Sequence, residues 1–141
     1  MWQQLPERLA AVVAVLRDAE IECLPALAII GRYATANTLL YIDPPYVRHT
    51  VHGHRKALYR YEMSHTDHVA LLDALDAHPG PVMLSGYHNG LYDDRLAAAG
   101  WRCAEIEAQA EKGNQRVECL WLNPQCTERL GFGPLWESSY D

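Results

Sequence analysis

The stretch that decides the fold is Thr38-Leu39-Leu40-Tyr41-Ile42-Asp43-Pro44-Pro45-Tyr46. Residues Leu39–Asp43 are mostly apolar and favour β-structure, which predicts a buried strand. Pro44 and Pro45 have fixed φ angles and cannot donate hydrogen bonds to a sheet, so the chain must leave the sheet after Asp43. A carboxylate, two stiffened carbonyls and the Tyr46 ring therefore lie at the carboxyl end of a strand, where open α/β sheets bind their ligands.

The chemistry of this corner suits the exocyclic amine of a nucleobase. The lone pair of such an amine is delocalised into the ring, so the amine is a poor nucleophile. Asp43 and the carbonyl of Pro44 offer two acceptors that would bind both N–H bonds and free the lone pair. Tyr46 can stack on a base that has left its helix. The corner would accept adenine or cytosine, and an Asp-Pro-Pro turn also occurs as a plain strand end capped by its aspartate.

The rest of the chain alternates helical and extended patterns. Helices are predicted over residues 6–19, 26–33, 64–77 and 91–99, and strands over residues 20–24, 39–43 and 81–87, followed by a hairpin of 101–108 and 115–122. This order predicts an α/β fold whose sheet is mainly parallel, with helices on its faces and a C-terminal antiparallel hairpin. Residues 125–141 show no periodicity and are predicted to form a tail.

Several side chains in these elements have specific expected places. Leu9, Val12, Val13 and Leu16 mark one face of the first helix, which we expect to pack against the sheet. Ser64 and Asp67 form a capping box at the start of a helix. His65 and His68, in the first turn of that helix, are expected on its solvated surface. Tyr87 ends a strand, where it either lines the same cleft as Tyr46 or packs in the core.

Length and composition indicate one globular domain. The chain has 141 residues, and no apolar run approaches the ~18 residues of a membrane span. The chain opens without a signal-peptide pattern, and the cysteine usage leads us to expect reduced thiols in a cytoplasmic protein. The four cysteines form no Cys-x-x-Cys pair, which indicates reduced thiols rather than a disulfide framework or a metal site. His49, His52 and His54 lack a nearby acid or thiol, so metal binding there is disfavoured.

The charge distribution points to one basic segment. The net charge is −6, which disfavours tight binding of DNA by the whole surface. Residues 47–61 contain four basic residues and no acid, whereas the rest of the chain carries 8 basic and 18 acidic residues. We predict that this segment is a loop that closes over substrate or contacts nucleic-acid phosphates. Its basic residues are Arg48, Arg55, Lys56 and Arg60.

Several segments together resemble a known family. They are Leu5–Leu9, Leu40–Tyr46, Tyr59–Met63, Val82–Tyr87, Leu91–Asp93 and Glu118–Pro124, which follow one another at suitable spacing. The chain resembles the Dam-like class of DNA N6-adenine methyltransferases from about Trp2 to Pro124. It matches the C-terminal part of a typical member, so residues 1–124 would be a partial catalytic domain.

The resemblance implies a Rossmann-like sheet and transfer of a methyl group from S-adenosylmethionine to a flipped adenine in DNA. It implies that Asp43, Pro44, Pro45 and Tyr46 are the catalytic residues. Asp43 and the Pro44 carbonyl would bind the adenine amino group, and Tyr46 would stack on the base. Asp43 and Tyr46 would also lie beside the cofactor.

The chain departs from the family pattern in two places. It contains no Phe-x-Gly-x-Gly cofactor loop, which we expect to precede Met1, and Ile21-Glu22-Cys23-Leu24 is followed by Pro25 where the family has an acid for the adenosine. Residues 38–43 would then expose a hydrophobic sheet edge. We expect residues 20–24 to cover this edge, or the chain to self-associate, or a complementing polypeptide to pair there. The alternative is an inactive remnant that acts as a binding or partner subunit.

Overall fold

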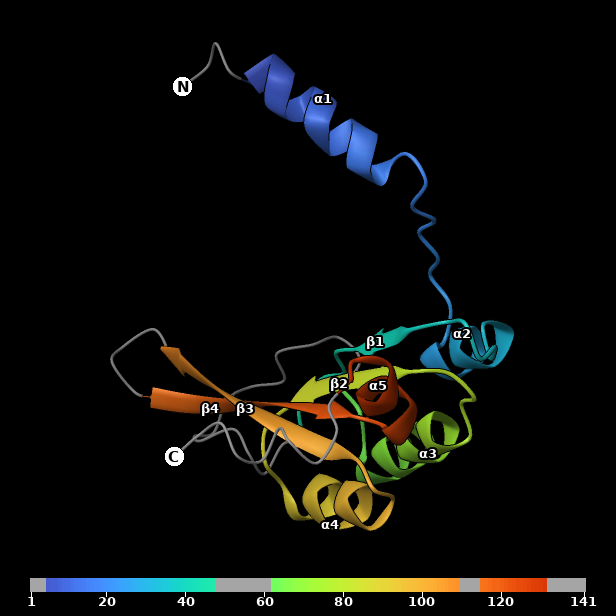
Figure 1. Ribbon diagram of the computed structural model, residues 1–141, viewed down its shortest axis with the longest axis vertical. Helices are drawn as coiled ribbons and strands as arrows, with labels where there is room; N and C mark the ends of the chain where they lie inside the picture. Colours follow the sequence, from blue (N-terminus) through green and yellow to red (C-terminus); the bar gives the residue numbers. More distant parts are fainter. Residues whose placement is uncertain (1–4, 48–61, 110–114, 132–141) are drawn as a thin grey trace.

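The computed structural model describes residues 5–47, 62–109 and 115–131, arranged around one sheet (Figure 1). The helices are α1 (Leu5–Leu16), α2 (Ala26–Arg32), α3 (His65–Asp76), α4 (Gly90–Ala98) and α5 (Pro124–Arg129). The strands are β1 (Leu40–Ile42), β2 (Val82–Gly86), β3 (Arg102–Gln109) and β4 (Gln115–Leu122). None of the described helices is long and apolar enough to cross a membrane.

The sheet is mixed, with the strand order β1-β2-β4-β3. β1 and β2 are parallel, while β4 pairs antiparallel with both β2 and β3. The α/β class and the hairpin are confirmed, but the prediction of a mainly parallel sheet is wrong. The reason is that the hairpin inserts β4 directly beside β2, and residues 20–24 do not add a second parallel neighbour to β1.

The core lies on the face of the sheet that α3 and α4 cover (Figure 1). Burial alternates along β2, where Val82 and Leu84 are completely buried and Met83 and Ser85 are half-buried. This alternation follows from the two-residue period of a strand. The helices contribute fully buried leucines to the same layer: Leu72, Leu75 and Leu96. α5 contacts β2 and β4 and lies on the other side of the sheet (Figure 1).

The first helix forms as predicted but does not pack against the sheet. α1 stands away from the body of the molecule at the end of an extended segment (Figure 1). Its expected core face is solvent-exposed, with Leu9 at 55% and Val13 at 60% exposure. Val12 and Leu16 are exposed as well. The predicted packing is therefore wrong, because helical periodicity reports that an apolar face exists and not what covers it.

Residues 20–24 form no strand, and Ile21 is 95% exposed. The Glu22 carboxylate pairs with Arg32 and accepts a hydrogen bond of 3.0 Å from the Tyr33 hydroxyl. These contacts hold the segment beside α2 instead of beside β1. The expectation that this segment covers the sheet edge is wrong.

Local residues set the ends of the helices, and the predicted capping box is confirmed. Pro25 precedes α2, and Ser64 and Asp67 form the capping box of α3, with the Asp67 N–H donating to Ser64 Oγ at 3.2 Å. α4 ends just before Gly100, whose φ of 78° favours glycine. Each of these features depends on residues within a few positions of one another.

The segment predicted as a tail begins with a helix. α5 follows Asn123, whose side chain caps it by accepting a hydrogen bond of 2.9 Å from the Cys126 N–H. The same side chain accepts from the Val82 N–H at 2.9 Å and donates to the Gly80 carbonyl at 2.9 Å. Asn123 therefore joins α5 to the start of β2. Residues 132–141 lie outside the described part of the chain.

A close backbone approach sets the position of β1. A Cβ atom on Gly80 would lie 2.5 Å from the Thr38 carbonyl oxygen and 2.6 Å from that of Thr35. Glycine is therefore required at this position. His78 Nε2 also lies 3.1 Å from the Thr38 oxygen, so the residues before β1 are fastened to the turn before β2.

Candidate active site at the carboxyl ends of β1 and β2

The predicted corner lies where the two parallel strands end. Ile42 is paired with Leu84, so Asp43 follows the end of β1 directly opposite the Ser85 position of β2. The strand itself is less buried than predicted. Leu40 is buried, but Tyr41 is 62% exposed and Leu39 is 53% exposed. β1 is an edge strand of the described sheet, which explains why its outer side chains meet solvent.

A serine that sequence reasoning missed holds the aspartate. The Ser85 Oγ lies 2.9 Å from Asp43 Oδ1 and 3.3 Å from the Ile42 carbonyl oxygen. The hydroxyl donates to the exposed carboxylate, since an ionised oxygen is the stronger acceptor. A serine that interrupts an apolar strand at its carboxyl end was the available signal in the sequence.

Two aromatic rings meet in the segments that follow these two strand ends. The centroids of Tyr46 and Tyr87 lie 4.6 Å apart, and the ring planes are tilted by 58°. Of the two alternatives for Tyr87, the structure supports the one that puts it beside Tyr46. Both residues are half-buried, so each ring is partly accessible from solvent.

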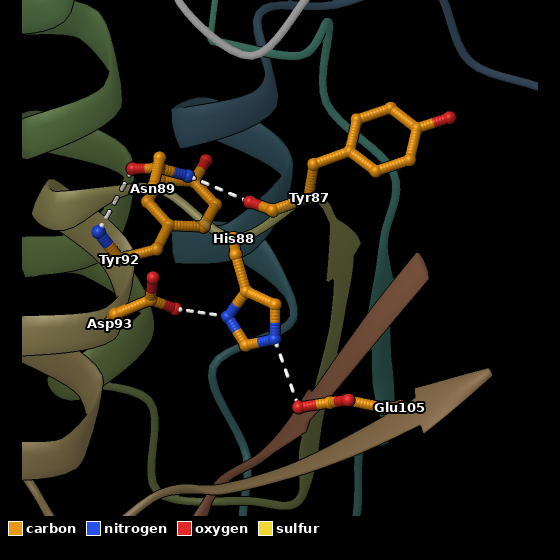
Figure 2. Close-up of polar contacts among 6 residues, drawn as sticks. All are labelled: Tyr87, His88, Asn89, Tyr92, Asp93 and Glu105. Atoms are coloured by element: carbon orange, nitrogen blue, oxygen red, sulfur yellow. Dashed lines mark hydrogen bonds and ion pairs between the residues drawn. The ribbon is translucent and has the colours of Figure 1, made fainter. Parts of the chain in front are cut away.

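The short segment after β2 is held by side-chain hydrogen bonds (Figure 2). The Asn89 amide donates to the Tyr87 carbonyl at 2.9 Å, and its oxygen accepts from the Tyr92 N–H at 3.0 Å. Asn89 is thus both the cap of α4 and the anchor of the Tyr87 backbone.

His88 lies between two carboxylates (Figure 2). Its Nδ1 is 2.9 Å from Asp93 Oδ1, and its Nε2 is 3.1 Å from Glu105 Oε1. The hydrogen bond to Asp93 is the main reason that the pKa of His88 is raised, and Glu105 adds to it. The imidazole also lies close to the thiols of Cys103 and Cys119.

The other predicted residues divide into three groups. His65 is exposed as expected, but His68 is only 1% exposed and its Nδ1 lies 2.8 Å from the Tyr92 hydroxyl. His68 turns inward because α4 packs against the first turn of α3. The basic residues Arg48, Arg55, Lys56 and Arg60 lie outside the described part of the chain, as do His49, His52 and His54.

The described residues provide only part of the S-adenosylmethionine site that the resemblance implies. Asp43 and Tyr46 provide a carboxylate and a ring where the resemblance puts the reacting end of the cofactor. Glu22, the acid closest to the expected adenosine contact, is paired with Arg32 and Tyr33. The sequence also contains no Phe-x-Gly-x-Gly segment, which is the other cofactor contact of the family. The described residues therefore do not make up a complete cofactor site.

No protein-family model and no curated protein matches this sequence. The class of protein is therefore defined by fold and site alone. The protein has an open, mixed α/β sheet. A carboxylate, a proline turn and two tyrosines lie at the carboxyl ends of the two parallel strands.

Proposed function

We propose that this chain provides the adenine-accepting corner of an S-adenosylmethionine-dependent DNA N6-adenine methyltransferase. The observation that carries the proposal is the Asp43 carboxylate, held by Ser85 at the ends of the two parallel strands, which the Tyr46–Tyr87 pair follows in sequence. The resemblance of the Asp43–Tyr46 segment to the family motif supports adenine as the acceptor. The strand-end position supports a ligand site, since open α/β sheets bind ligands at that end.

In this proposal each residue of the corner helps to bind, orient or activate the adenine. Asp43 and the Pro44 carbonyl accept hydrogen bonds from the two N–H groups of the base, which draws its lone pair out of the ring. Ser85 is a positioning residue, because it acts on the base through Asp43. Tyr46 stacks on the extruded base, and Pro45 keeps the turn rigid so that little entropy is lost on binding.

S-adenosylmethionine would supply the methyl group. The incomplete cofactor contacts predict weak binding by this chain, unless another polypeptide adds the glycine-rich loop. The proposed DNA contacts are phosphates bound by Arg48, Arg55, Lys56 and Arg60, which form a basic segment in an otherwise acidic chain.

The test is to incubate the purified chain with unmethylated DNA of mixed sequence and millimolar S-adenosylmethionine. The DNA is then digested to nucleosides, and N6-methyladenine is counted by mass spectrometry. We expect the wild-type chain to form N6-methyladenine and Asp43→Ala to form at least a hundredfold less. Asp94→Ala, which changes an exposed aspartate on α4, is the matched control and should leave the yield unchanged.

Calorimetric titration with S-adenosylmethionine accompanies the assay. Weak binding that Asp43→Ala removes is expected. A folded wild-type chain that yields no more N6-methyladenine than Asp43→Ala would overturn the proposal that this chain is catalytic.

A second candidate is a partner subunit, and the outer edge of β1, which pairs with no other strand among the described residues, favours it. An edge strand offers backbone N–H and C=O groups to further strands, and the exposed Leu39 and Tyr41 add apolar surface that pairing could bury. In this reading the chain completes its sheet with a second copy or with another polypeptide.

A further inference from the structure

A cluster of potential metal ligands lies on the sheet face that α4 covers. Glu105 of β3 is paired with Cys119 of β4, and Cys103 lies two residues before Glu105 on the same strand. Because residues two apart on a strand share a face, these three side chains project to the same side. His88 reaches them from the segment after β2, and its ring lies between Asp93 and Glu105 (Figure 2).

The spacing of the donor atoms suits one ion. A ring nitrogen of His88 and the Sγ atoms of Cys103 and Cys119 all lie within 4.8 Å of one another. Zinc–sulfur bonds of ~2.3 Å put two tetrahedral sulfur ligands about 3.8 Å apart. The required contraction is at most about 1 Å, which side-chain rotation can supply because Cys103 and His88 are exposed.

The donor types select a soft ion. Thiolate and imidazole ligands in a tetrahedral arrangement are typical of Zn²⁺, whereas Mg²⁺ and Ca²⁺ prefer oxygen ligands. The two carboxylates beside His88 also suit a zinc site. Asp93 accepts from His88 Nδ1, which leaves Nε2 for the metal in the arrangement common to zinc-bound histidines. Glu105, now 3.1 Å from Nε2, is close enough to become a fourth ligand.

From this geometry we infer that His88, Cys103 and Cys119, with Glu105, form a zinc-binding site. Three ligands from three different segments would tie the β3–β4 hairpin to the segment that carries Tyr87 and Asn89. With four protein ligands the site would be structural, since catalytic zinc keeps an open position. The inference does not depend on the proposed methyltransferase activity.

The site can be tested with Co²⁺, which gives a thiolate-to-metal charge-transfer band and tetrahedral visible bands. The reduced, metal-free chain is titrated with Co²⁺ under anaerobic conditions, and Zn²⁺ is then added. We expect saturation at one equivalent of Co²⁺ and loss of the bands when Zn²⁺ displaces it. Zn²⁺ should also raise the melting temperature of the chain, because it binds the folded form.

Variants assign the ligands. Cys103→Ser should lower the charge-transfer band to about half or less, since only the Cys119 thiolate remains, and this exposed position should leave the circular dichroism spectrum unchanged. Asp93→Asn should weaken Co²⁺ binding by about 10- to 100-fold, the range for such outer-sphere partners. Cys23→Ser, at an exposed cysteine of the extended segment, is the matched control and should keep the full band.

Two results would overturn the site. One is a folded wild-type chain that gives no charge-transfer band with Co²⁺, including a chain that binds Co²⁺ through histidines alone. The other is a band that persists at full intensity in Cys103→Ser.

Discussion

The Ser85 hydroxyl lies 2.9 Å from Asp43 Oδ1 and joins the carboxyl ends of the two parallel strands. β1 has only three residues and lies at the edge of the described sheet, where it pairs with β2 alone. The Asp43 side chain is exposed, and the hydrogen bond from Ser85 limits the rotation of its carboxylate.

Ser85→Ala should therefore lower the proposed methyl transfer without unfolding the chain. A hydrogen bond to an ionised group contributes about 1.5 kcal/mol or more, which corresponds to roughly a tenfold lower rate. The measurement is the initial rate of N6-methyladenine formation at saturating DNA, together with the melting temperature. We expect kcat to fall while KM for DNA and the melting temperature stay close to wild type. Ser85→Thr retains the hydroxyl and should recover most of the rate; equal rates for Ser85→Ala and wild type would contradict the positioning role.

Asn123→Ala should destabilise the fold strongly. The substitution leaves the buried N–H of Val82, the Gly80 carbonyl and the Cys126 N–H without their side-chain partner. Each unsatisfied buried group costs about 1–3 kcal/mol, so we expect the free energy of unfolding to fall by about 3 kcal/mol. Urea denaturation followed by circular dichroism measures this change. Gln125→Ala, at an exposed neighbouring residue, is the control and should change the free energy of unfolding by less than about 0.5 kcal/mol. An equally small loss in Asn123→Ala would show that the three Asn123 hydrogen bonds do not stabilise the fold.

His68 should make the stability of the fold depend on pH. Burial lowers the pKa of His68 below its ordinary value of 6.5, outweighing the nearby Asp67, and His65 lowers it slightly. The unfolded chain then binds more protons than the folded chain just below pH 6.5. This contribution to stability is fully present above pH 6.5, and it is lost as the pH falls from 6.5 through the folded-state pKa.

The measurement is urea unfolding at pH 8, 6.5 and 5 for wild type and His68→Gln. We expect the free energy of unfolding to fall more steeply toward pH 5 in wild type than in the variant, which lacks the titrating group. His65→Gln, at the exposed histidine of the same turn, should keep the wild-type slope. Parallel slopes for wild type and His68→Gln would show that His68 does not cause the effect.

Tyr41→Pro should block pairing at the β1 edge. The Leu40 N–H donates to the carbonyl of Pro81, the residue before β2, so the alternation of a strand directs the Tyr41 N–H outward. Proline at this position removes that donor and leaves the β1–β2 bonds in place. We expect light scattering after size-exclusion chromatography to show concentration-dependent association of wild type and a monomer for Tyr41→Pro. Tyr41→Val keeps the donor and should still associate; a wild-type chain that stays monomeric at all concentrations would exclude self-association.

Several features could be predicted from the sequence because they depend on neighbouring residues. Proline at positions 25 and 44, glycine at position 100 and the Ser64–Asp67 capping box restrict the backbone or satisfy its hydrogen bonds locally. The hairpin was evident from two alternating runs around a turn. The position of Asp43 at a strand end likewise followed from the two prolines after it.

Other features were decided by the tertiary structure. The insertion of β4 beside β2, the exposure of α1 and the burial of His68 depend on which elements meet in space. Ser85 reaches Asp43, and His88 reaches Cys103 and Cys119, across long stretches of sequence. Local periodicity shows that a segment has an apolar face, but strand pairing and helix packing choose the partner of that face. Thus the sequence alone determined where β1 stops and which groups it presents, and the fold determined which side chains surround them.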